Sequence, residues 1–254
     1  MASPIEFEVS TPIPGTRWHE LALVLLATIV ITWPLQRGGG DVWLADQLFR
    51  LQGGAWHARY TWWASGLLHE GGRDLCILMF LVLLGIWIAS ARRAALAPWR
   101  IPLGYLLTAL LTATVLLFVS KRFSGVDCPW DLARYTGTRL YLPPFSGHAA
   151  AVPPGTCFPA AHAGVGYAWL ALWFALRPIR PHWRKPALLM TLGLGLVFGF
   201  VQQLRGAHFL SHDLWSLALC WLVAATLARF WRWDASPAAR GREPGCDCDA
   251  EPAR

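Results

Sequence analysis

Six long apolar runs dominate this sequence and restrict it to folds in which helices cross a lipid bilayer. A helix that spans the hydrocarbon core, about 30 Å thick, needs about 20 predominantly apolar residues. The runs cover residues 21–35, 75–90, 101–120, 158–176, 186–204 and 209–230. Because some of them are shorter than this, we expect those helices to tilt or to insert shallowly. The pattern predicts an all-α fold, a polytopic membrane protein built as a bundle of six transmembrane helices.

The composition excludes a water-soluble domain. Only 15% of the 254 residues are charged, against about 25% in a typical soluble domain, and 55% are hydrophobic. The net charge of +7 would suggest nucleic acid in a soluble protein, but here the excess cations lie in short clusters between apolar runs. The bias of cytoplasmic loops toward Lys and Arg explains this distribution, so we expect the bilayer as a partner and no nucleic acid.

The first apolar run is expected to stay in the protein as a membrane span. A signal peptide begins with a basic segment, whereas this run is preceded by Glu6, Glu8 and Glu20, with Arg17 as the only cation. No small-residue cleavage site follows Pro34. Between the first two runs, residues 41–73 mix tryptophans with charged residues, a pattern typical of amphipathic helices that lie at the membrane interface.

The loop charges predict the orientation of the bundle. The second and fourth loops contain cations and no acid, namely Arg92, Arg93, Arg100, Arg177, Arg180, Arg184 and Lys185. Both loops are therefore expected to be cytoplasmic, and the charge-balanced first loop to be periplasmic. This places both termini in the cytoplasm of a bacterium whose inner membrane holds the protein. Residues 1–233 form one membrane-embedded domain in this prediction, and residues 234–254 form a disordered cytoplasmic tail.

Three polar clusters lie at the outer ends of the third to sixth runs, on one side of the predicted bundle. The candidate site residues in them are two histidines, one acid and three cations: His162, His208, Asp213, Lys121, Arg122 and Arg205. An acid in the first turns of an apolar run is costly and implies a partner or a function. Cations of this kind bind phosphate, one histidine can attack phosphorus, the other can protonate the leaving oxygen, and an acid can orient the attacking ring. This chemistry needs no metal and no other cofactor.

At these residues the chain resembles the type 2 phosphatidic acid phosphatase superfamily, whose three motifs occur in this order at these positions. The first motif, Lys followed seven residues later by Arg-Pro, matches Lys121 and Cys128-Pro129, with the arginine replaced. The second, Pro-Ser-Gly-His, matches the segment 159–162, which keeps His162 and lacks the serine. The third aligns on Val201-Gln202, His208 and His212, with the serine and arginine replaced and Asp213 one position beyond the expected acid.

The resemblance implies a role for each matched residue. His208 would be the nucleophile, His162 the general acid and Lys121 a phosphate ligand. Arg122 and Arg205 are close enough in sequence to substitute for the missing arginines, and either Asp213 or His212 would orient the nucleophile. The segment 145–148 resembles the second motif more closely by its letters, so His148 is a reserve for His162, although it lies in the middle of a loop.

The cysteines predict one disulfide. Cys128 and Cys157 share the third loop, on the oxidising side of the predicted topology, and we expect them to be bonded rather than two free thiols. Cys76 and Cys220 lie within apolar runs and are expected to be ordinary apolar residues. Cys246 and Cys248 in the tail are weak grounds for a metal site.

These observations predict a periplasm-facing phosphatase that cleaves a phosphomonoester or a diphosphate on a membrane lipid through a phosphohistidine. An isoprenoid diphosphate, a phosphatidylglycerophosphate and the phosphate of lipid A all fit. Two alternatives stay open. One is a phosphotransferase that passes the phosphoryl group to another lipid, and the other is a non-catalytic protein that binds lipid phosphates.

Overall fold

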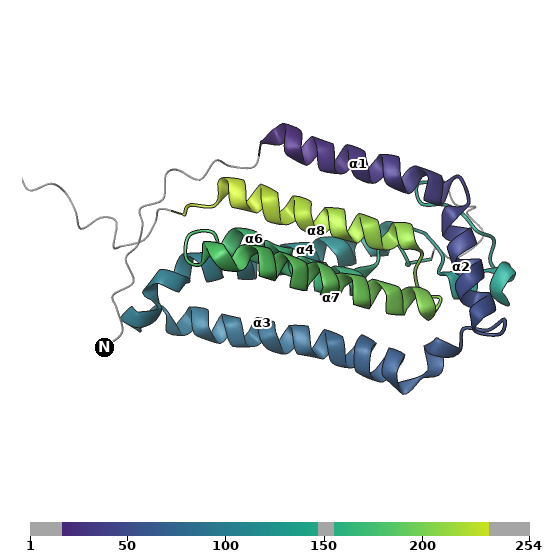
Figure 1. Cartoon of the computed structure of the whole chain (residues 1–254), viewed down its shortest axis with the longest axis horizontal. Helices are drawn as coiled ribbons and strands as arrows, with labels where there is room; N and C mark the ends of the chain where they lie inside the picture. The colour runs from purple at the N-terminus through teal and green to yellow at the C-terminus, as the bar shows by residue number, and fades with distance from the viewer. Residues whose placement is uncertain (1–16, 147–154, 234–254) are drawn as a thin grey trace, which may run out of the picture.

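Long helices aligned along one axis make up most of the molecule (Figure 1). The computed structural model describes residues 17–146 and 155–233. Five helical segments in this part of the chain are long and apolar enough to cross a membrane, and they identify a multi-pass membrane protein. Their principal helices are α1 (Trp18–Gln36), α3 (Gly72–Ala89), α4 (Arg100–Phe123), α7 (Arg184–Leu204) and α8 (Leu210–Phe230). No strand forms among the described residues.

The fourth apolar run, residues 158–176, does not form one continuous α-helix of the length that a membrane span needs. It folds as α5 (Ala161–Tyr167), a 3-10 turn (Ala168–Ala171) and α6 (Leu172–Ala175). At about 1.5 Å per residue this segment is only about 22 Å long. It is mostly buried against the other helices, and a Cβ atom on Gly166 would lie 2.8 Å from the Cα of Gly195 in α7. The described residues therefore contain five candidate spans, and the sixth predicted span is not confirmed.

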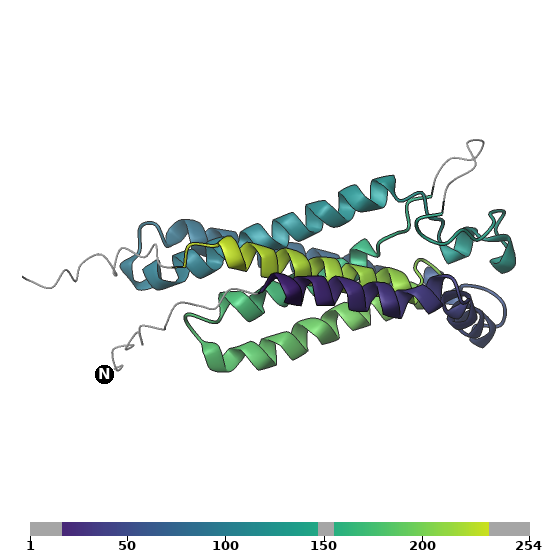
Figure 2. The same cartoon turned by 90° about the horizontal axis from the view of Figure 1, so that it is seen from above.

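The segment between the first two spans also differs from the prediction. One amphipathic helix, α2 (Gly40–Leu51), crosses the end of the bundle, with Leu48 buried and Trp43 exposed (Figures 1 and 2). The next residues form 3-10 turns (His57–Tyr60) and a π-helical segment (Trp62–Gly71) that runs directly into α3. The range predicted as interfacial therefore includes the start of a candidate span, Trp62–Ala89, and only α2 still matches the interfacial prediction.

The helix directions gather the loops into two groups. The cation-rich loops 90–99 and 177–183 lie at one end of the bundle, together with the start of α1 and the end of α8 (Figure 1). The 3-10 turns in these two loops are Ala94–Trp99 and Pro181–Trp183. The ends of α4 and α7 and the starts of α5 and α8 lie at the opposite end, as the predicted arrangement requires.

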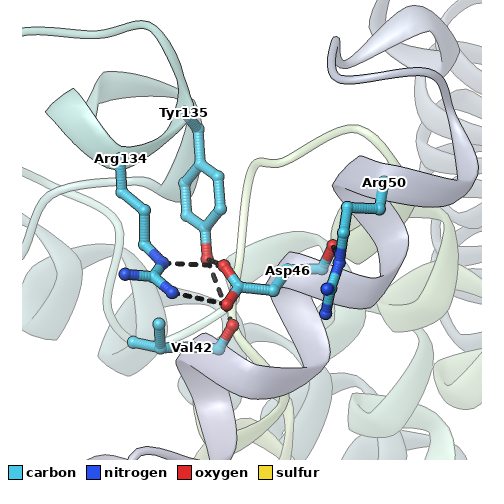
Figure 3. Close-up of polar contacts among 5 residues, drawn as sticks. All are labelled: Val42, Asp46, Arg50, Arg134 and Tyr135. Carbon is cyan, nitrogen blue, oxygen red and sulfur yellow. Dashed lines mark hydrogen bonds and ion pairs between the residues drawn. The ribbon is translucent and has the colours of Figure 1, made fainter.

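Polar contacts hold α2 to the loop that covers this second end of the bundle. The Arg134 guanidinium donates two hydrogen bonds to the Asp46 carboxylate, at 2.7 and 2.6 Å, and the Tyr135 hydroxyl donates to the same carboxylate at 3.0 Å (Figure 3). The hydrogen bonds from Arg134 hold the pKa of Asp46 below its ordinary value. The loop contains the two short 3-10 helices Pro129–Asp131 and Ala133–Tyr135. The hydrogen bonds to Asp46 of α2 therefore fix the position of this loop over the helix ends.

Candidate active site

A cavity of about 600 Å³ opens at the end of the bundle that α2 crosses, among α3, α4, α5 and the turn after α7. Four of the six predicted site residues line it: Lys121, His162, Arg205 and His208. They come from three segments far apart in the sequence. The helices run antiparallel, so the end of α4, the start of α5 and the end of α7 meet at one place.

His208 is held by a backbone carbonyl. Its Nδ1 lies 2.7 Å from the carbonyl oxygen of Cys157, and the side chain is buried. A carbonyl oxygen only accepts, so Nδ1 carries the proton and Nε2 keeps its lone pair. Burial lowers the pKa of His208 well below its ordinary value, which keeps the ring neutral at pH 7. A neutral imidazole with a free Nε2 lone pair is a competent nucleophile.

The turn before His208 depends on Gly206. Its φ of +69° lies in the left-handed region, and a Cβ atom there would lie 2.5 Å from the Trp56 ring. Only glycine suits both the conformation and the space. This turn reverses the chain between α7 and α8 and brings His208 back to the cavity.

His162 is the second residue of α5 and packs between two rings. It stacks on Phe198, with ring centroids 4.7 Å apart, and meets His69 edge-on at 4.4 Å. Its Nε2 lies 3.2 Å from the carbonyl oxygen of Leu68. By the argument used for His208, that contact leaves Nδ1 as the nitrogen that can exchange a proton with a bound molecule.

Two cations line the same cavity without an acidic partner. Neither Lys121 nor Arg205 forms an ion pair within residues 17–146 and 155–233. Arg205 donates from one terminal nitrogen to Gln202 Oε1 at 2.9 Å, and its buried Nε has no partner among the described residues. Burial lowers the pKa of Arg205, although a guanidinium stays charged at neutral pH. Partly desolvated, unpaired cations bind phosphate strongly.

Two predicted site residues lie outside the cavity. Arg122 is exposed to solvent, because the next residue along a helix points about 100° away and only Lys121 faces inward. Asp213 is buried against α7, where its carboxylate accepts a hydrogen bond from Gln203 at 2.5 Å. In this structure the hydrogen-bond partner of the His208 ring is the Cys157 carbonyl, and not Asp213. The His212 ring lies 5.8 Å from that of His208, between Phe158 and Phe209.

The cavity also contains two polar residues that the sequence analysis missed. His69 and Arg73, four residues apart on the helical segment that leads into α3, both line it. The Nδ1 of His69 lies 2.6 Å from Nε2 of Gln202, the residue aligned with the family's third-motif arginine. The signal was available, because both residues stand at the outer end of an apolar run, as His162 does.

The predicted disulfide is present. Cys128 and Cys157 are bonded, with Cα atoms 5.2 Å apart, and both line the cavity. Cys76 and Cys220 are buried free thiols. The residues His148, Cys246 and Cys248 fall outside the described parts of the chain. No group of three or more His, Cys, Asp or Glu in those parts is placed to hold a metal ion.

The wall of the cavity changes character along its length. The histidines and cations gather at the end nearest α2, whereas Ile77 and Phe80 of α3 and Leu110, Leu111 and Phe118 of α4 supply an apolar wall. A molecule with a phosphate at one end and a hydrocarbon chain at the other matches both parts.

Comparison with protein families identifies the family of this chain. The family model of the PAP2 superfamily matches residues 102–235, a little more than half of the chain and including all three motif segments. The comparisons with curated proteins and with solved structures each found no match. The family match and the cavity that joins the motif residues lead to one conclusion: the chain belongs to the PAP2 superfamily.

Proposed function

We propose that this protein hydrolyses a phosphomonoester or a diphosphate on a membrane lipid, at the periplasmic face of a bacterial inner membrane. Membership of the PAP2 superfamily indicates a phosphatase. The observation that supports a lipid substrate is the lining of the cavity. Unpaired cations and two histidines lie there next to an apolar wall formed by α3 and α4. A phosphate and its hydrocarbon chain would each find matching surroundings there.

The mechanism follows from the positions of the two histidines. Lys121 and Arg205 bind the phosphoryl oxygens and stabilise the charge that develops on them. Nε2 of His208 attacks phosphorus to form a cationic phosphohistidine. The bond from phosphorus to the lipid oxygen breaks as His162, which enters the reaction as an imidazolium, donates its Nδ1 proton to that oxygen. His162 then removes a proton from water, which attacks the phosphohistidine and releases inorganic phosphate and neutral His208.

The three candidate substrates have the same chemical features. An isoprenoid diphosphate, a phosphatidylglycerophosphate and lipid A each carry a phosphate at the membrane surface and long apolar chains beneath it. The periplasmic orientation is supported by the cation-rich loops, which lie at the end of the bundle opposite the cavity.

The test is phosphate release by the purified protein in detergent from a panel of these lipids, with and without an acceptor lipid. Hydrolysis without an acceptor, abolished in His208→Ala, is the expected result. Release that requires the acceptor would instead identify a phosphotransferase. Binding of the lipids without turnover would identify a non-catalytic protein. Under alkaline quenching, which preserves phosphohistidine, label from the substrate should appear on His208, and label on His162 would contradict the assignment.

A further inference from the structure

The disulfide near the cavity joins the residue that orients His208 to the loop around it. We propose that the Cys128–Cys157 bridge is a positioning element for the nucleophile: it fixes the carbonyl of Cys157, and that carbonyl sets the tautomer and direction of the His208 ring. The inference rests on the proposed function, because it takes His208 as the attacking group.

The contact between His208 and Cys157 is the only hydrogen bond that the His208 ring makes with the described residues. No carboxylate substitutes for it, since Asp213 is bonded to Gln203 and Asp41 to Ser211. In triad chemistry the carboxylate side chain of an acid orients the imidazole. Here the orienting oxygen belongs to a loop, so its position depends on whatever restrains the loop.

Three restraints converge on that loop. The Cys157 amide donates to the carbonyl oxygen of Val126 at 2.8 Å, and Gly125 pairs with Gly155 in an isolated antiparallel bridge. The disulfide adds a covalent link between Cys128 and Cys157, which are 29 residues apart in sequence. Two backbone contacts alone allow small shifts of a loop carbonyl, whereas a covalent link next to them restricts such shifts.

The same link also reaches the other side of His208. The Trp130 amide, two residues after Cys128, donates to the carbonyl oxygen of Gly206 at 2.9 Å. The disulfide thus connects the segment that holds the turn before His208 with Cys157, whose carbonyl accepts the hydrogen bond from Nδ1 of His208. Both anchors of the ring are tied to one another through the bridge.

Loss of the bridge should affect the chemical step more than binding. If the Cys157 carbonyl is not fixed, the proton on the His208 ring distributes between Nδ1 and Nε2. Only the tautomer with the proton on Nδ1 leaves Nε2 free to attack. The phosphate ligands Lys121 and Arg205 are not part of the bridge, so binding should change little. In metal sites, partners that orient a ligating imidazole are typically worth about tenfold to a hundredfold in activity, and we expect a loss of similar size here.

The experiment compares wild type with the Cys128→Ala/Cys157→Ala double variant and with wild type treated with a phosphine reductant, in detergent with a lipid phosphate that the wild type hydrolyses. We expect kcat to fall about tenfold or more in both, with KM within about twofold of wild type. The reductant should cause no further loss in the double variant. Cys220→Ala, which removes a buried thiol outside the bridge and the cavity, should behave as wild type.

A spectroscopic measurement separates positioning from a general loss of structure. In wild type, ¹⁵N-labelled histidine should give a His208 signal of the neutral tautomer with the proton on Nδ1. The reduced protein, measured below its unfolding temperature, should give a mixture of tautomers. An unchanged kcat and a single unchanged tautomer after reduction, with His208→Ala inactive, would overturn the inference and leave the proposed function intact. Full activity of His208→Ala would overturn the proposed mechanism as well.

Discussion

Arg205 and Arg122 differ in a way that only the structure reveals. Both were candidates to replace the missing family arginines, but Arg205 lines the cavity with a buried, unpartnered Nε, and Arg122 is exposed. Removing a charged donor to a phosphoryl group costs about 2–4 kcal/mol in the transition state, so Arg205→Ala should lose about thirtyfold to a thousandfold in kcat/KM. Arg122→Ala is the matched control and should stay within about twofold. Equal losses in the two variants would show that the cavity does not bind the phosphate.

His208 should also give the enzyme a characteristic pH dependence. Burial lowers its pKa well below the ordinary value of about 6.5, and the neutral ring is the reactive form. As the pH falls below 6.5, the His208 ring in the native protein therefore stays neutral and reactive until the pH reaches its lowered pKa. With a diphosphate substrate, whose leaving group needs no protonation, kcat/KM corrected for substrate ionisation should not decline as the pH falls from 7.5 to 5.5. A decline with an apparent pKa near 6.5 would contradict a buried nucleophile.

The residues of the site were predictable only in part. Motif order predicted that Lys121, His162 and His208 lie close together, because the ends of antiparallel helices meet, and all three line the cavity. Spacing alone does not give the direction of a side chain around its helix, so it did not predict that Arg122 and Asp213 lie outside the cavity. The Cys157 carbonyl could not have been found from residue types, since every residue carries the same backbone oxygen.

At the scale of the elements, α2 and α8 are joined by one buried carboxylate. Asp41 accepts from the Ser211 amide at 3.0 Å and from the Ser211 hydroxyl at 2.5 Å, so it satisfies an otherwise unpaired N–H at the start of α8. Burial raises the pKa of Asp41. Asp41→Ala leaves these donors buried without a partner and should cost about 1–3 kcal/mol, seen as a lower Tm in detergent.

Asp46→Ala on the same helix is the control for Asp41→Ala. Its partner Arg134 is more than half exposed, so that pair should contribute less than about 1 kcal/mol. If the two variants lowered Tm equally, the link from Asp41 to Ser211 would not be what holds α2 on α8.

Hydropathy predicted the presence of helices better than their role. Residues 158–176 and Trp62–Gly71 show two limits of hydropathy. A buried helix and a membrane span are equally apolar, so hydropathy alone does not show that the first, mostly buried segment is shorter than the span it predicts. The tryptophans of the second suggested the interface, yet its π-helical turns continue into α3 and extend the span. In both cases the packing of the neighbouring helices determines the role of the segment, and the local sequence does not predict that packing.

The whole molecule has two chemically different ends, and this asymmetry predicts its orientation. Seven cations without an acid lie in the loops and at the first residues of α4 and α7 at one end, and the cavity and the disulfide lie at the other. Cytoplasmic loops favour Lys and Arg, and disulfides persist in oxidising compartments, so both features predict that the cavity faces the periplasm.

Reporter fusions test this orientation. A fluorescent protein fused after Arg93 or after Arg184 should be bright, and alkaline phosphatase fused at either position should be inactive, because both junctions should lie in the cytoplasm. Fusion after Gly137, in the loop over the cavity, should give the opposite pair of results. Replacing Arg92 and Arg93 with Glu should weaken the bias and give mixed signals after Arg93, since the rule depends on cations near the ends of the spans. A periplasmic signal after Arg184 in the unaltered protein would place the cavity in the cytoplasm, where the disulfide would not persist, and would remove the periplasmic assignment.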